Sequence, residues 1–195
     1  MNNIDKIIIS LALIMTTSTY AGWKEGMAAA DKGEHEKAYM EFLPLAESGH
    51  VSAQTTVGVM YYSGQGVPQD YDAALVWLNI AANSGHDVAQ YNLGIMYDNG
   101  IGIDQDFSEA AKWYRLAANQ GHARAQLNLG AMYKNGDGVK KDISRAHLWF
   151  NIASSMGDND AAENLQQVEL LMTVEQMDDA QLLAGQCVDS DYQDC

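Results

Sequence analysis

The stretch AANSGHDVAQYNLGIMY, residues 81–97, returns 36 residues later as AANQGHARAQLNLGAMY, residues 117–133. Aligned without gaps, the similarity extends over three successive segments, 53–88, 89–124 and 125–160, and each neighbouring pair is identical at 16 of 36 positions. A fixed period of this length is typical of proteins in which one small unit is stacked several times. The sequence therefore predicts a repeat architecture.

Apolar residues within each segment recur with the spacing of an α-helix. Ala89, Leu93 and Met96 fall at i, i+4 and i+7 in the first half of one segment, and Ala110 and Trp113 begin the same pattern in the second half. Such spacing places side chains on one face of a helix. Each segment is predicted to form two amphipathic helices.

The stretch between the two predicted helices carries two glycines and ends in aspartate. It reads SGQGVPQD, NGIGIDQD and NGDGVKKD in the three segments. Glycine permits the positive φ that a tight reversal requires. We expect Asp70, Asp106 and Asp142 to cap the helix that follows each loop.

A glycine also recurs in the middle of each first helix, where it costs about 1 kcal/mol relative to alanine. Its presence as Gly58, Gly94 and Gly130 predicts that two backbones approach closely there. The Met, Tyr and Trp residues shared by the segments are interpreted as core filling and not as a cofactor site.

The stretch AQYNLGIMYDNGIGIDQDFSEAAKWYRLAANQGH, residues 89–122, resembles the Sel-one-like repeat, a branch of the tetratricopeptide superfamily. The resemblance covers residues 53–160 and extends more weakly to residues 23–52. It implies an all-α fold, a right-handed α/α superhelical solenoid of about four helical hairpins with a C-terminal capping helix.

The expected domain organisation follows from the repeat. Residues 22–187 form the solenoid, and residues 188–195 form an acidic C-terminal tail. The hairpins are expected at about 23–52, 53–88, 89–124 and 125–160, with the cap at 161–187. Within the cap, Asp160 and Glu163 have the spacing of a capping box, Thr173 and Gln176 have the same spacing for a last helix, and Gly185 marks its expected end.

Three histidines each follow a glycine at the predicted end of a second helix: His50, His86 and His122. A solenoid separates equivalent residues by about 8 to 10 Å, whereas each zinc–nitrogen bond is only about 2.1 Å long. The histidines are therefore interpreted as turn-packing residues. Neither a metal site nor a cofactor is predicted.

One stripe on the first helices lies opposite the positions that repeat, and it varies from segment to segment. Its members are Thr55, Val59, Tyr62, Tyr91, Ile95, Asp98, Leu127, Ala131 and Lys134. In tetratricopeptide-like solenoids the first helices line a concave groove, so the resemblance implies that this stripe binds a partner. Burial by stacking of neighbouring helices is the alternative.

The N-terminus has the order of a secretory signal peptide. A start containing Lys6 precedes an apolar run over residues 7–15, and small residues follow up to Ala21. The run is about half as long as a membrane-spanning helix requires. We expect residues 1–21 to be a signal peptide that is cleaved after Ala21, no permanent membrane span, and a periplasmic or secreted protein; a buried N-terminal helix is the alternative.

The net negative charge of the chain limits which classes of macromolecule can be its partner. The chain carries 26 acidic and 11 basic residues, and residues 161–195 contain eight acids without a lysine or arginine. An acidic excess repels phosphate backbones, so nucleic acid is not expected as a partner. The acidic end is either a solvated cap or a face that binds a protein with a basic surface.

The only two cysteines, Cys187 and Cys195, lie close together at the C-terminus. In an exported protein such a pair favours a disulfide, and two free thiols are the alternative. No arrangement of nucleophile and base or phosphate-binding loop appears in the sequence.

These observations favour a binding protein over an enzyme. The expected function is an exported protein-protein interaction module that holds its partner through the concave face or the acidic C-terminal end. Resemblance to the family implies adaptor, regulatory or toxin-neutralising roles. A cell-wall or hydrolytic enzyme of the envelope and a periplasmic sensor are the alternatives.

Overall fold

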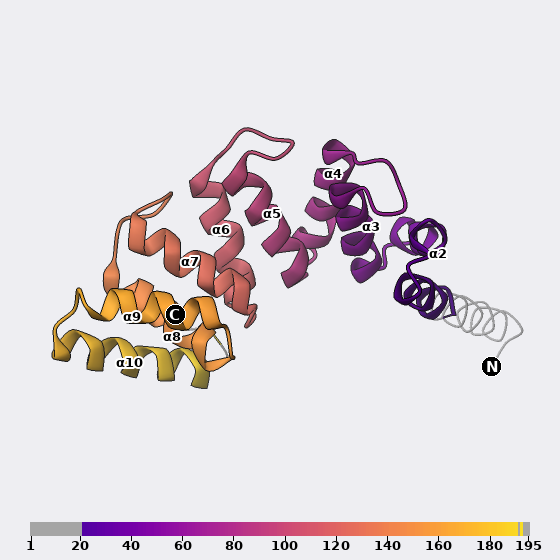
Figure 1. Cartoon of the computed structure of the whole chain (residues 1–195). Coiled ribbons are helices and arrows are strands. Elements are labelled where there is room, and N and C mark those ends of the chain that lie inside the picture. Colours follow the sequence, from indigo (N-terminus) through magenta and orange to yellow (C-terminus); the bar gives the residue numbers. More distant parts are fainter. Residues whose placement is uncertain (1–20, 191, 193–195) are drawn as a thin grey trace, which may run out of the picture. The chain divides into compact units, whose positions relative to one another are not determined.

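The structure is a computed structural model that describes residues 21–190 and residue 192, and all regular structure in this part of the chain is α-helical (Figure 1). Residues 21–31 are helical. The helices that follow are α2 (His35–Glu47), α3 (Val51–Ser63), α4 (Tyr71–Asn83), α5 (Asp87–Asn99), α6 (Phe107–Ala118), α7 (Ala123–Asn135), α8 (Ile143–Ser155), α9 (Asn159–Glu169) and α10 (Val174–Asp189). The all-α prediction is confirmed. Of the predicted signal peptide, residues 1–20 lie outside the described residues.

The helices belong to two compact units, one ending at Ser84 and one beginning at Gly85. In the first unit α2 packs against α3 and α3 against α4. In the second unit α5 pairs with α6, α7 pairs with α8, and the connections α6 to α7 and α8 to α9 are also packed. Within each unit, consecutive helices therefore pack against one another as hairpins, as the resemblance implies.

Aspartate caps the second helix of each repeat, as predicted. The Asp70 carboxylate accepts a hydrogen bond from the Ala73 backbone N–H at 3.0 Å, and Asp142 accepts one from the N–H of Arg145 at 3.0 Å. Asp106 accepts from two N–H groups at the start of α6. These bonds satisfy backbone donors that have no partner within the helix.

Each loop contains two glycines, and different structural constraints require glycine at the two positions. The first, such as Gly136 with a φ of 92°, ends a first helix in the left-handed conformation. The second also lies directly against the preceding second helix: a Cβ on Gly66 would collide with the carbonyl of His35, and one on Gly138 with the carbonyl of Phe107. The loop of Gly66 is thereby held against the start of α2, and the loop of Gly138 against the start of α6.

The mid-helix glycines each face a large side chain of the partner helix, and at Gly58 the partner's backbone also comes close. A Cβ on Gly94 would lie 2.5 Å from the Tyr114 ring, and one on Gly130 would lie 2.7 Å from the Phe150 ring. A Cβ on Gly58 would lie 2.8 Å from the Leu78 side chain and 3.2 Å from the Leu78 backbone nitrogen, so the expected close approach of backbones is found there. The glycine makes room for a large side chain of the partner helix, because a close-packed core leaves no space for an added methyl group.

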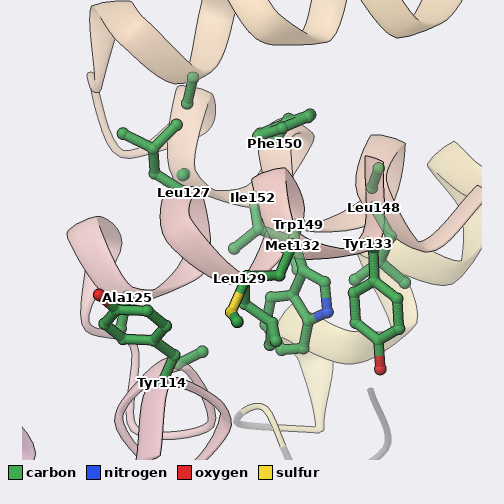
Figure 2. Packing of buried hydrophobic residues seen from close by; sticks show 14 of the residues in the cluster. Tyr114, Ala125, Leu127, Leu129, Met132, Tyr133, Leu148, Trp149, Phe150 and Ile152 are labelled. Carbon is green, nitrogen blue, oxygen red and sulfur yellow. The ribbon is translucent and has the colours of Figure 1, made fainter. Parts of the chain in front are cut away.

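A separate apolar core fills each unit. Phe42, Leu45 and Val57 are buried in the first. In the second, Tyr114, Phe150 and other apolar side chains of α6 to α8 are buried together (Figure 2). The repeated methionines Met60, Met96 and Met132 are all buried, which supports their interpretation as core.

The C-terminal cap differs in detail from its prediction. Thr173 and Gln176 form the predicted capping box. The N-cap of α9 is Asp158 and not Asp160, because the Asp158 carboxylate accepts the Ala161 N–H at 3.0 Å. The last helix continues past Gly185 to Asp189 and packs mainly against α8. Among the described residues, no helix is both long and apolar enough to cross a bilayer.

Candidate functional site

The stripe predicted to bind a partner begins in the first unit on α3. Thr55 is only 4% exposed and its hydroxyl donates to the Val51 carbonyl at 3.2 Å. Val59 and Tyr62 are half-buried, and the Tyr62 ring lies 5.8 Å from the ring of Tyr71. Burial, and then the proximity of Tyr71, raises the pKa of Tyr62. Thr55 is therefore not accessible to a partner.

In the second unit the stripe starts with two residues that pack against neighbouring helices. The Tyr91 ring stacks on the imidazole of His122, with ring centroids 4.5 Å apart. Leu127 is 8% exposed and belongs to the apolar core. Thr55 and Leu127 are thus largely buried, which favours the alternative of burial over partner binding for these two, and the role of the stripe as a whole stays a prediction.

The rest of the stripe in this unit remains half-buried: Ile95, Asp98, Ala131 and Lys134. The Lys134 ammonium donates to the Asn164 side chain of α9 at 2.6 Å, so it links α7 to α9. The Asp98 carboxylate accepts from the Tyr114 hydroxyl at 3.1 Å. Burial raises the pKa of Asp98, and Asp137 raises it further, while the bond from Tyr114 opposes this rise. The polar atoms of Asp98 and Lys134 are therefore engaged in hydrogen bonds between helices of this unit.

The acidic end contains the most exposed apolar side chains of the described residues. Leu170 is 87% exposed, Val174 is 70% exposed and Leu182 is 63% exposed. Leu182 lines a shallow hollow of about 380 Å³ on the outer face of α10, together with Asp178, Gln181, Gly185, Gln186 and Asp189. We call Leu170, Leu171, Val174 and the residues of this hollow the C-terminal surface.

Only one cysteine of the predicted disulfide, Cys187, lies among the described residues. Cys187 is wholly buried on the inner side of α10, in the apolar core of the second unit. Cys195 lies outside the described residues, so its pairing with Cys187 stays a prediction.

The histidines at the repeat junctions cap the start of a helix or stack on an aromatic ring. The Nδ1 atoms of His50 and His122 each accept a backbone N–H bond at 3.2 Å, from Ala53 and Ala125 respectively. His50 also stacks on Trp23, at 5.0 Å between ring centroids. No group of three or more potential metal ligands is found within the described part of the chain.

One polar cluster in the second unit escaped the sequence analysis. Arg115 of α6 and Arg145 of α8 both donate hydrogen bonds to the hydroxyl of Tyr133 on α7. The tyrosine recurs in every repeat and was interpreted as core, whereas the arginines each occur in one repeat only. A search for charged residues that depart from the repeat pattern would have found them.

Comparison with known families identifies the repeats. The Sel1 repeat family matches three times, at residues 51–86, 87–122 and 123–158. These matches are contiguous, and they start two residues before the repeats predicted from the sequence. No curated protein matches the sequence significantly.

Solved structures give the same fold. A Sel1 repeat protein from Oxalobacter formigenes is similar with a TM-score of 0.70 and 33% identity, over 73% of this chain and 59% of that one. The protective antigen c5321 of uropathogenic Escherichia coli, which has an SLR fold, gives a TM-score of 0.60 and 26% identity, over 89% of this chain and 47% of its own. Cysteine-rich protein B of Helicobacter pylori shares the fold at 21% identity and a TM-score of 0.55, over 66% of this chain and 95% of its own.

This chain therefore spans little more than half of the first of these relatives and about half of the second. Sel1 repeats are helical scaffolds that generally mediate protein interactions. Since three contiguous repeats cover more than half of the residues and the helices pack as successive hairpins, the chain belongs to the Sel1 repeat family.

Proposed function

We propose that this protein is an exported interaction module that binds a partner protein, one with a basic surface, through the C-terminal surface. The observation that carries the proposal is the exposure of Leu170, Val174 and Leu182 within an acidic region. Exposed apolar groups that lie together mark interaction sites, because their burial against a partner is favourable.

The positions along α10 make this surface continuous. Val174, Asp178, Leu182 and Gln186 follow one another at intervals of four residues, so they share one face of the helix. Asp178 and Asp189 flank Leu182 in the same hollow. An apolar centre with acidic residues around it favours a basic partner, since opposite charge accelerates association and excludes acidic competitors.

Charge balance supports the choice of a basic partner. The described part of α9 and α10, up to residue 190, contains the acids Asp160, Glu163, Glu169, Glu175, Asp178, Asp179 and Asp189 and no lysine or arginine. The partner proposed here is a protein, because phosphate-rich nucleic acid would be repelled by the same field.

The test compares matched variants in a quantitative binding assay. Partners captured by cross-linking in the native envelope are identified first, and affinity is then measured for the purified pair. Leu182→Ser combined with Asp178→Lys should weaken binding by at least about tenfold, as expected for a central contact and its charge. The matched control is Val76→Ser, which changes another exposed apolar residue, 58% exposed on α4.

A partner that binds the double variant as tightly as the unchanged protein would exclude the C-terminal surface. Ile95→Ser then tests the half-buried stripe on α5 and α7 as the contact area. Loss of binding with that variant alone would assign the partner to the stripe.

Export is proposed on the N-terminal sequence, and the packing is compatible with it. Among the described residues, Trp23 is the first large side chain, and its ring lies 5.1 Å from the ring of Phe42, on the part of the chain that cleavage after Ala21 retains. N-terminal sequencing of the protein from its native host should begin at Gly22. An intact Met1 in the soluble cytoplasmic fraction would refute export.

A further inference from the structure

Two guanidinium groups converge on one buried tyrosine hydroxyl. An Arg115 Nη donates to the Tyr133 oxygen at 2.6 Å, and an Arg145 Nη donates to the same oxygen at 2.9 Å. Both guanidinium carbons also lie within 6 Å of the ring centroid, at 5.9 and 5.5 Å. Tyr133 is 4% exposed, and Figure 2 shows its hydroxyl pointing away from the other labelled core side chains. The ring is thus part of the core while its hydroxyl positions two exposed arginines.

The positive charge gathered here is only partly balanced. The two bonded nitrogens can be no farther apart than the sum of the two hydrogen-bond lengths, so like charges are held close together. Asp142 is the one acid that lines this region: its Oδ2 lies 3.7 Å from the Nε of Arg145, and its Oδ1 accepts the backbone N–H of that residue. Arg115 has no acidic partner among the ion pairs of the described residues, and Lys140 adds a further positive charge. An anion placed between the arginines would relieve their repulsion.

The surrounding space is large enough for a small ligand group. A hollow of about 360 Å³ opens beside the hydroxyl, lined by Arg115, Tyr133, Val139, Lys140, Asp142 and Arg145. This volume lies at the lower end of the range of small-molecule sites. Val139 gives the hollow one apolar wall.

The other repeats show that the fold does not require this arrangement. The tyrosine recurs as Tyr61, but there its hydroxyl is hydrogen-bonded to the hydroxyl of Tyr39 at 2.7 Å. The neighbouring repeats carry asparagine in place of Arg115, namely Asn79 and Asn151, and they carry alanine or glutamate, Ala73 and Glu109, in place of Arg145. The tyrosine therefore belongs to the repeat, and the arginine pair is an addition to one copy.

We propose that this hollow is a carboxylate-binding site, with Arg115 and Arg145 donating to the carboxylate and Tyr133 fixing their positions. The planar fork of a guanidinium matches the two oxygens of a carboxylate. Two of the three arginines of a chain with a net charge of -15 are placed here. Phosphate-rich polymers and anionic membranes are repelled by the acidic remainder of the chain, whereas a single carboxylate can approach an isolated basic hollow. The proposal does not depend on the proposed function.

The source of the carboxylate is either a peptide or a free organic acid, and two probes distinguish them. One is citrate, and the other is a blocked peptide with a single glutamate between glycines. Each is titrated into the full mature protein while the Nε–Hε signals of the arginines are followed by NMR. Saturable shifts of the Arg115 and Arg145 signals are expected with at least one probe.

Matched variants then test the residues. Arg115→Gln and Tyr133→Phe should each weaken the binding by at least about tenfold, because one loses a charged donor and the other loses the group that positions both arginines. Arg124→Gln is the control, since Arg124 is exposed and paired with Asp158 and Asp160 outside the hollow. Thermal melting establishes that each variant is folded.

Binding of the peptide without citrate assigns the site to a partner protein, and binding of citrate alone assigns it to a small acid. The proposal is overturned if neither probe produces saturable shifts, if affinity is the same in the folded Arg115→Gln variant, or if inorganic phosphate binds more tightly than both carboxylates. The last outcome would replace a carboxylate by a phosphate ligand.

Discussion

Single residues explain why histidine follows glycine at the helix junctions. The glycine takes a positive φ, 80° at Gly121, and the histidine after it becomes the N-cap of the next first helix. In the fourth copy Asp158 occupies the same position and makes the same kind of bond. The histidine thus replaces a common capping residue and adds an aromatic face, which Tyr91 covers in the case of His122.

The cap predicts a dependence of stability on pH. Burial lowers the pKa of His122, although Asp87 opposes the shift, so the folded state favours the neutral ring. The contribution of His122 to the free energy of unfolding is therefore fully present above about pH 6.5, and it is lost as the pH falls through the pKa of His122 in the folded state. His122→Asn keeps a cap that does not titrate. Urea unfolding between about pH 7.5 and pH 5 should show a smaller loss of stability for this variant than for the unchanged protein.

His86→Asn is the control for this experiment, because His86 starts α5 without a side-chain cap bond. Burial also lowers the pKa of His147, against the attraction of Glu169, and this background is common to all three proteins. Equal pH dependence in the unchanged protein and the His122→Asn variant would contradict the assignment.

Two glycines in helices predict opposite effects of the same substitution. Gly94→Ala should lower the free energy of unfolding by about 1 to 3 kcal/mol, since the new Cβ would overlap the Tyr114 ring. Gly185→Ala in α10 should raise it by about 0.5 to 1 kcal/mol, because no atom lies within 4 Å of the added Cβ and alanine is the better helix former. Thermal and urea unfolding of both variants measure the difference, and a stable Gly94→Ala variant would show that the two helices can separate there.

At the scale of elements, α10 carries the prediction about the cysteines. Pairing of Cys187 with Cys195 would tie the C-terminal residues to a helix that packs on α8. The intact mass of the exported protein should lie two hydrogens below that of the reduced chain, consistent with one disulfide. Alkylation of both thiols without prior reduction would exclude the bond.

Most helices could be predicted because the local signals agree. Apolar spacing, loop glycines and capping aspartates each indicate the same boundaries, and the structure confirms Asp70, Asp106 and Asp142 as caps. The start of α9 was misjudged because two nearby aspartates, Asp158 and Asp160, have equal capping propensity and only the backbone geometry chooses between them.

The candidate sites were harder to predict because they depend on contacts between repeats. Helix spacing predicts that Thr55 and Leu127 lie on an outward stripe, yet both are buried, and Leu127 belongs to the apolar core of the second unit. The arginine pair is formed by residues from three helices, α6, α7 and α8, and no spacing within one repeat reveals it. Side chains that act across repeats can be recognised only after the repeats are placed in space.

At the scale of the whole molecule, the two compact units predict separate responses to damage. Phe42 is 1% exposed in the core of the first unit, and Phe150 is fully buried in that of the second. Each Phe→Ala substitution should lower the free energy of unfolding of its own unit by about 3 to 5 kcal/mol. In repeat proteins each repeat is stabilised mainly by its contacts with adjacent repeats. Hydrogen exchange should rise in α2 to α4 for Phe42→Ala and in α5 to α10 for Phe150→Ala. A uniform rise along the chain in either variant would mean that the two units unfold together.

A glycine that holds a loop against the preceding helix, as found once in each unit, has a consequence for how such a chain grows by gene duplication. Gly66 lies against the start of α2 and Gly138 against the start of α6. A copied repeat brings both parts of this contact, its own loop glycine and its own second helix, so it fits before or after any other copy. The arginine pair has no such property, because Arg115 and Arg145 come from different repeats. Duplication therefore preserves the scaffold, while a ligand site built between two particular copies survives only where those copies stay adjacent.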